Sequence, residues 1–326
     1  MTTDPHATTN HRATTDFHAT TDSHATAAHH TTTHHAHRLA TAALDWLHTH
    51  RHLGAFPPGA TEIGDPDRVY KPLGETALAA SLVLREGVAG PASLARAREL
   101  LDFTWSEFRA GDLLYERQLR HWLLTDPLET YAHFARAGLR HDRLHALLEH
   151  SAAVGSATEV LPNRALAVAN ARRTTGIGAA PDWTALTRAT WLGGTPEPWA
   201  IDWTTGYSLT HTVFHLTDWG ARPHDLPPDL ADYLTAWLPV WIDVWTEVAQ
   251  WDLVGELLIV GACLPEPHLD PAEWQVLASV QHDDGLVPRD GDPVSDDPAT
   301  RFADHQHPAV VAVIAGTLAL SRLLTG

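Results

Sequence analysis

The chain has 326 residues, a formal net charge of −18 and a single cysteine, Cys263. The acidic balance opposes binding to nucleic acid or to an anionic membrane surface, and one cysteine excludes an intrachain disulfide and any zinc site built from several thiolates. The sequence has no run of about 18 apolar residues, so we expect no membrane span. The first residues are polar and lack the apolar core of a signal peptide, so we expect a cytoplasmic protein.

Residues 1–37 differ in kind from the rest of the chain. Histidine, threonine and alanine dominate, and a degenerate six-residue repeat, His-Ala-Thr-Thr-Asp-x, recurs at His6, His18, His24 and His30. Such a segment cannot bury an apolar core, so we expect a disordered tail. Its histidines could bind zinc, nickel or copper loosely, or the segment could be an expanded repeat without a role.

Helical periodicity begins at residue 38. Leu39, Ala42, Leu44 and Leu47 open an amphipathic stretch. Further predicted helices, separated by Gly and Pro, cover 74–84, 93–110, 112–123, 127–138, 141–152, 162–174, 182–191, 205–219, 228–248, 250–263, 271–281 and 307–323. Patterns typical of strands are nearly absent.

About a dozen helices joined by short connections indicate stacked helical hairpins. A strict period of about 34 or about 40–47 residues, which would indicate a regular repeat array, is absent. Helices 250–263 and 307–323 are apolar nearly all round, as expected of helices inside a larger helical layer. We therefore expect an all-α fold, a single α/α toroid over residues 38–326, in preference to an open superhelix.

The run Tyr207–Gly220 carries the clearest candidate site. It places His211, His215 and Asp218 at i, i+4 and i+7, which on a helix lie within about 60° of one another. Two imidazoles and a carboxylate on one stripe can bind a divalent metal or perform acid/base chemistry. Thr212 stands where a His-Glu-x-x-His metalloprotease would have glutamate, so that class is excluded.

A second candidate lies on the apolar helix 250–263, where Asp252 and Glu256 form the one charged stripe. Buried carboxylates are costly unless they are paired, protonated or metal-bound. They could be an acid/base pair or metal ligands, or they could mark solvent-touching first turns. A zinc site on the histidine stripe would need a further ligand from a distant helix, and His307, Glu256 and Asp252 are the candidates. His307 lies just before the last apolar helix and could point at the mouth of the ring, as could Asp304 or His305.

Three other features receive simpler interpretations. His141, His145 and His150 have charged neighbours, which predicts an exposed helix face. The acidic loop 290–297 does not have the spacing of a calcium loop. Cys263 lies in an apolar run and is expected to be a buried small hydrophobe.

The sequence also carries two resemblances to known families. Gln281-x-x-Asp284-Gly285, followed later by His307 at the head of an apolar helix, resembles a pattern in helical toroids such as terpenoid cyclases, prenyltransferase β subunits and lanthionine-synthetase-like cyclases. The whole body from about residue 40 resembles an uncharacterised helical family of actinobacterial type, through Tyr70-x-Pro72-Leu-Gly-Glu75, Asp126-Pro-x-x-Thr-Tyr131, Tyr207–Gly220 and Trp251-Asp-x-x-Gly-Glu256. That family implies the fold and no established activity.

The leading functional hypothesis is a metal-assisted or acid/base enzyme acting on a small molecule or peptide. Zn²⁺ or another divalent metal would be bound by His211, His215, Asp218 and His307, and Asp252 or Glu256 would be the general base. Tyr207, on the same stripe as the histidines, is the third catalytic candidate.

Two alternatives stay open. A metal-free carbohydrate-active toroid would use Asp252 and Glu256 as acid and base, with sugars stacked on Trp203, Trp219, Trp245 or Trp251. A non-catalytic helical scaffold would bind a protein partner on a concave surface.

Overall fold

The computed structural model of the chain describes residues 12–60, 63, 70–155 and 159–325, and these fold into thirteen α-helices with short connections and no strand. The prediction of an all-helical fold is thereby confirmed. Most predicted helices lie within a few residues of the observed ones, because Gly and Pro mark many of the breaks.

Six of the helices contact one another in sequence order, and the last contacts the first. They are α2 (Lys71–Glu86), α5 (Asp126–Arg136), α7 (Pro162–Thr175), α9 (Trp203–Leu216), α11 (Trp251–Cys263) and α13 (Pro298–Thr325). Each packs against the next, and α13 packs against α2. The succession therefore encloses a central region between helices that are far apart in the sequence.

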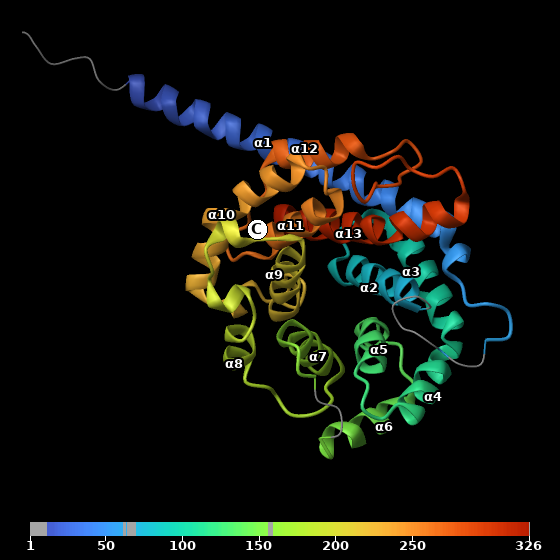
Figure 1. Cartoon of the computed structure of the whole chain (residues 1–326). Coiled ribbons are helices and arrows are strands. Elements are labelled where there is room, and N and C mark those ends of the chain that lie inside the picture. The colour runs from blue at the N-terminus through green and yellow to red at the C-terminus, as the bar shows by residue number, and fades with distance from the viewer. Residues whose placement is uncertain (1–11, 61–62, 64–69, 156–158, 326) are drawn as a thin grey trace, which may run out of the picture.

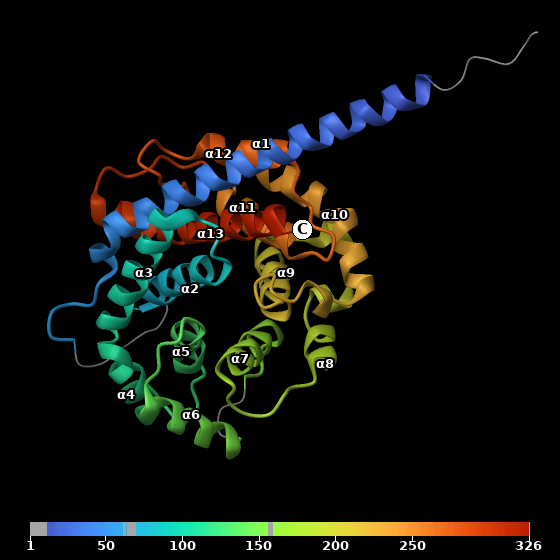
Figure 2. The same ribbon diagram turned by 180° about the vertical axis from the view of Figure 1, so that it is seen from behind.

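The remaining helices lie at the periphery (Figures 1 and 2). They are α1 (Arg12–His50), α3 (Gly90–Glu107), α4 (Asp112–Arg120), α6 (Asp142–Ala153), α8 (Trp183–Arg188), α10 (Pro228–Glu247) and α12 (Pro271–Val280). Several cover an inner helix directly: α1 packs on α13, α3 on α2, α8 on α7, and α10 on α11. This second layer explains why α11, buried over nearly its whole length, is apolar on nearly every side.

Local sequence signals account for the helix ends that matter here. Asp202 and Thr205 form a reciprocal capping box at the start of α9. Gly87 ends α2 in the left-handed conformation, with φ 69°, and Gly176 ends α7 in the same way, with φ 73°. These ends set how far each inner helix reaches along the central region.

The expected boundary at residue 37 lies inside α1, which is continuous from Arg12 to His50. Thr32 and Ala36, which we expected in a disordered tail, are 1% and 0% exposed. The hydroxyl of Thr32 donates to the carbonyl of Leu269, 3.1 Å away. Small residues on this stretch thus pack against the body, although its composition is polar. His6 of the repeat lies outside the described residues, and α1 projects past the other helices at its N-terminal end (Figure 1).

By length and composition alone, α13 could cross a membrane. Most of its apolar stretch is buried in the protein, where it packs against α1, α2 and α11. The packing of a core helix therefore accounts for its composition.

The contact between α1 and α13 gives a test of this packing. A Cβ at Gly316 would lie 2.4 Å from the carbonyl oxygen of Ala36 and 2.7 Å from the Cβ of Ala40. We expect Gly316→Ala to lower the free energy of unfolding by about 1–3 kcal/mol, because α1 must move away. Gly194→Ala is the control, because a Cβ added there would meet no heavy atom within 4 Å among the described residues, apart from the adjoining residues of its own chain segment. Equal urea midpoints for the two variants would contradict the close contact.

Candidate functional site

The central region contains a pocket of about 800 Å³ lined by residues from all six inner helices. Its walls combine apolar side chains, such as Phe214, Ile259 and Val311, with charged and polar side chains. A concave, largely apolar chamber with a few convergent polar groups is the usual form of a small-molecule site.

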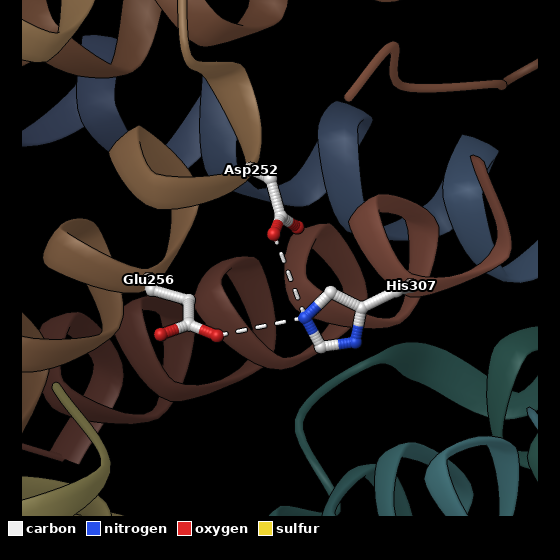
Figure 3. Close-up of side chains that lie close together, drawn as sticks. All are labelled: Asp252, Glu256 and His307. Carbon is white, nitrogen blue, oxygen red and sulfur yellow. Dashed lines mark ion pairs between the residues drawn. The ribbon is translucent and has the colours of Figure 1, made fainter. Parts of the chain in front are cut away.

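Two carboxylates from α11 and one imidazole from α13 meet on the wall of this pocket (Figure 3). His307 Nε2 lies 3.6 Å from Asp252 Oδ2 and 3.5 Å from Glu256 Oε1. One ligand atom from each residue lies within 4.8 Å of the others. Asp252 and Glu256 are 5% and 1% exposed, so they do not form a solvent-touching turn. Asp252, Glu256 and His307 are called the central triad below; the triad could hold a metal ion.

A third carboxylate, Glu75 of α2, lies on the other side of the imidazole. Its Oε1 is 3.1 Å from His307 Nδ1 and 3.7 Å from the Nζ of Lys71. Burial alone would lower the pKa of His307, but Asp252 and Glu75 outweigh it and raise that pKa well above its ordinary value. His307 is therefore an imidazolium between three carboxylates.

Hydroxyl groups of α9 complete the triad's contacts. Tyr207 donates its phenolic hydrogen to Asp252 Oδ2, 2.5 Å away, and Thr210 donates to Glu256 Oε2. Burial and the neighbouring Glu256 raise the pKa of Asp252. Burial would also raise the pKa of Glu256, but His211 and His307 outweigh it and lower the value to about 2. As the pH falls, Asp252 therefore takes up a proton before Glu256 does.

The two predicted histidines of α9 both line the pocket, but in different places. His211 Nε2 lies 3.5 Å from Glu256 Oε1, and its side chain is 41% exposed. His215, one turn further along, is outside the central triad. Burial, and then the neighbouring His211, lower the pKa of His215 well below its ordinary value.

Asp218 does not continue the predicted stripe. The helix α9 ends at Leu216, and Asp218 has a left-handed backbone with φ 48°. Its Oδ1 accepts a hydrogen bond from Arg136 Nη2 at 2.8 Å, and Arg85 Nη1 donates to its carbonyl oxygen. The i+7 spacing assumed that the helix continues to residue 218. Because α9 ends before that residue, Asp218 lies off the face of the two histidines and pairs with arginine.

The chain matches the family described as Domain of unknown function (DUF6895) over residues 40–317. It belongs to that family. The resemblance of the body from about residue 40 to an uncharacterised helical family is thereby confirmed. No curated protein and no solved structure matches this DUF6895 chain.

His307 occupies a different local setting from the one predicted. We expected it just before the last apolar helix, with its side chain at the mouth of the ring. In the structure α13 begins at Pro298 and continues through Pro308. His307 therefore lies inside a buried helix, and its ring points toward Asp252 and Glu256 (Figure 3).

Glu75 and Lys71 were not among the predicted site residues. Glu75 is the single acidic residue in the predicted buried helix 74–84, the same signal that identified Asp252 and Glu256. It could have been found by applying that criterion to every apolar helix. Lys71 precedes the helix predicted there and carries no such signal.

Other sequence interpretations have mixed outcomes. His145 is buried and not exposed as predicted, whereas His150 is exposed. His141 caps α6 by accepting a hydrogen bond from the Leu144 amide. Cys263 is fully buried, and burial raises the pKa of its thiol to about 12.

The contact between Glu75 and His307 predicts a pH effect in metal-free protein. Glu75→Gln should lower the pKa of His307, measured by NMR titration with His307→Asn to assign the signal. The folded-state pKa of His307 lies above its unfolded value of about 6.5. Its charge therefore stabilises the fold fully below that pH, and the contribution is lost as pH rises through the folded pKa.

Glu86→Gln on the same helix is the matched control for this titration, because Glu86 pairs with Arg85 instead. It should leave the pKa of His307 unchanged. A wild-type His307 that titrates at about 6.5 would contradict the three-carboxylate environment.

Proposed function

We propose that this DUF6895 protein is a metal-assisted enzyme that binds Zn²⁺ or a similar divalent ion at Asp252, Glu256 and His307 and acts on a small molecule or peptide in the adjoining pocket. The observation that carries the proposal is the convergence of these three side chains, from two helices, on the wall of a pocket of about 800 Å³.

The chemistry of the donor set supports a divalent ion. Two carboxylates and one imidazole suit Zn²⁺ and its first-row neighbours better than a soft, thiolate-binding metal. Three carboxylates face one imidazolium and the ammonium of Lys71 at this end of the pocket, so negative charge is in excess there. In addition, Asp252 Oδ1 is buried and has no hydrogen-bond partner among the described residues.

Contacts around the triad favour the same conclusion. Glu75 faces the ring nitrogen of His307 that points away from Asp252 and Glu256, an arrangement that orients an imidazole ligand. Tyr207 fixes one oxygen of Asp252. A metal-binding imidazole must be neutral, so a metal would displace the proton that His307 holds in the free protein.

The remaining roles follow from accessibility. A bound ion would lower the pKa of a water molecule or polarise a substrate oxygen. His211 is half-exposed beside Glu256 and lines the pocket, so it is the group best placed to accept or donate a proton. In this proposal the expected roles are exchanged: Asp252 and Glu256 are ligands, while His211 and His215 belong to the substrate pocket.

We also infer that the closed succession of inner helices is an α/α toroid. The support is that α2, α5, α7, α9, α11 and α13 contact one another in order and close on α2. Peripheral helices separate them along the chain. In such an arrangement the site lies in the ring, where all six inner helices contribute to its wall.

One observation favours a metal-free alternative. The pKa of Asp252 is raised by burial and Glu256, while that of Glu256 is lowered to about 2, a divergence typical of an acid/base pair. Trp203 and Trp219 line the pocket and could stack on a sugar, whereas Trp245 and Trp251 are not among its lining residues. Metal binding separates this alternative from the leading proposal.

Metal binding is the direct test. Isothermal titration of zinc into the chelator-treated full chain should show one equivalent that His307→Ala removes, in addition to any uptake by the His-rich N-terminal residues. Titration in buffers of different ionisation enthalpy should show proton release, because His307 is protonated beforehand.

His224→Ala is the matched control for this experiment, because His224 is exposed and lies outside the pocket. It should retain the equivalent that His307→Ala loses. Identical zinc stoichiometry and affinity in the two variants would contradict the proposed site.

The bond from Tyr207 to Asp252 yields a finer prediction. Tyr207→Phe removes only the hydroxyl that orients Asp252 Oδ2. Loss of such an orienting contact should weaken zinc binding about 10–100-fold. Tyr233→Phe, whose hydroxyl bonds the carbonyl of Pro196 outside the pocket, should bind zinc like wild type. Equal affinities for the two variants would show that Tyr207 does not orient a ligand.

A further inference from the structure

We propose that the α5 end of the pocket, where Arg136 lies with His133 and His215, binds a carboxylate of the substrate. The substrate would then be an acidic molecule that spans the chamber, with its carboxylate at Arg136 and its reacting oxygen at the central triad. This inference deepens the proposed function and rests on it for the reacting end.

The first argument is the position of the guanidinium group. Arg136 and Asp218 form an ion pair, with Nη2 2.8 Å from Oδ1. Of the two, Arg136 lines the pocket and Asp218 does not. A ligand in the chamber therefore meets the cationic member of the pair, while the anionic member lies behind it.

Further guanidinium groups surround Asp218. Arg85 approaches its Oδ2 at 4.0 Å and is paired with Glu86, while Arg173 is paired with Asp225. None of these four groups lines the pocket. Arg85 also donates a hydrogen bond to the carbonyl oxygen of Asp218, so this residue is held by arginines on two sides.

The second argument is the set of hydrogen-bond donors beside Arg136. His133 of the same helix, His215 of α9, and Asn170 and Thr174 of α7 all line this part of the wall. Arg136 Nη2 donates to Thr174 Oγ1 at 3.3 Å, which links α5 to α7. Neutral imidazole can donate one hydrogen bond, and a carboxylate accepts several.

The charge environment of both imidazoles is consistent with an anion. Burial and then Arg136 lower the pKa of His133 to about 3, and Arg164 and Arg173 contribute to lowering that of His215. Glu129 is the carboxylate at this end, but it is bound by Arg164 at 2.6 Å and by Thr125. Arg136, Arg164 and Arg173 therefore act on these two imidazoles from close range, while Glu75 acts on His133 in the opposite sense.

The lining of the same pocket also includes apolar side chains, among them Leu78, Phe214 and Ile259. Such a wall favours a hydrocarbon segment between the two polar ends of a ligand. The expected substrate is therefore amphiphilic along its length, and a free ammonium at the Arg136 end would be rejected.

The test uses three probes that share one alkyl chain: hexanoate, hexanamide and hexylammonium. They are added to the full chain kept metal-free by a chelator, and dissociation constants are measured by ligand-observed NMR. We expect hexanoate to bind about tenfold more tightly than hexanamide, because a charge-assisted bond replaces a neutral one. Hexylammonium should bind instead at the triad end, where negative charge is in excess, so its affinity should not depend on Arg136. Equal binding of hexanoate and hexanamide would overturn the inference.

The variants isolate Arg136. In Arg136→Met/Asp218→Asn both charges are removed together, so no buried charge is left unpaired. Asparagine also tolerates the left-handed backbone at position 218. This double variant should bind hexanoate and hexanamide within about twofold of each other. A cooperatively melting double variant that keeps the hexanoate preference would overturn the inference.

Asp218→Asn alone is the matched control. It also provides an independent test of the inference if the double variant does not fold. It leaves the guanidinium charge without its partner, so the preference for hexanoate should be kept or increased. A loss of preference in this variant would also overturn the inference. Because the probes need no metal, a protein that prefers hexanoate but binds no zinc supports the carboxylate site while contradicting the proposed function.

Discussion

The interaction on which the site depends is the contact of one half-buried imidazolium with three carboxylates. His307 of α13 lies between Glu75 of α2 and the pair Asp252 and Glu256 of α11. Each of these groups would be costly to bury alone, and they come from three helices that are distant in the sequence. The packing of α2, α11 and α13 therefore decides the chemistry of this part of the pocket, because it brings these four groups together.

The same pocket is polarised along its length. Carboxylates are in excess at the α11–α13 wall, whereas a guanidinium and two imidazoles line the α5–α9 wall. Arg136 lines the chamber, whereas its ion-pair partner Asp218 does not. This separation of charge favours a ligand that carries a carboxylate at one end and a metal-binding oxygen at the other. Neither end of the pocket would predict such a ligand by itself.

Much of the fold could be predicted from the sequence, since apolar periodicity and Gly or Pro breaks report on the chain locally. The site was harder for a physical reason. The prediction grouped His211, His215 and Asp218 by spacing on one helix, but α9 ends at Leu216 and the triad instead draws on two helices. Proximity between helices depends on tertiary packing, which spacing does not report. Acidic residues on an otherwise apolar helix were the better signal, and it holds for Asp252, Glu256 and Glu75.

That signal has an energetic basis. A buried ionic cluster contributes little net stability compared with well-packed apolar side chains of similar volume, because desolvation offsets the attraction. α11 is otherwise an ideal core helix, with twelve residues from Asp252 to Cys263 buried. Leucine at positions 252 and 256 would satisfy the packing of such a helix without any partner. The carboxylates, with Asp252 Oδ1 still lacking a partner among the described residues, are thus better explained by a ligand than by the stability of the fold.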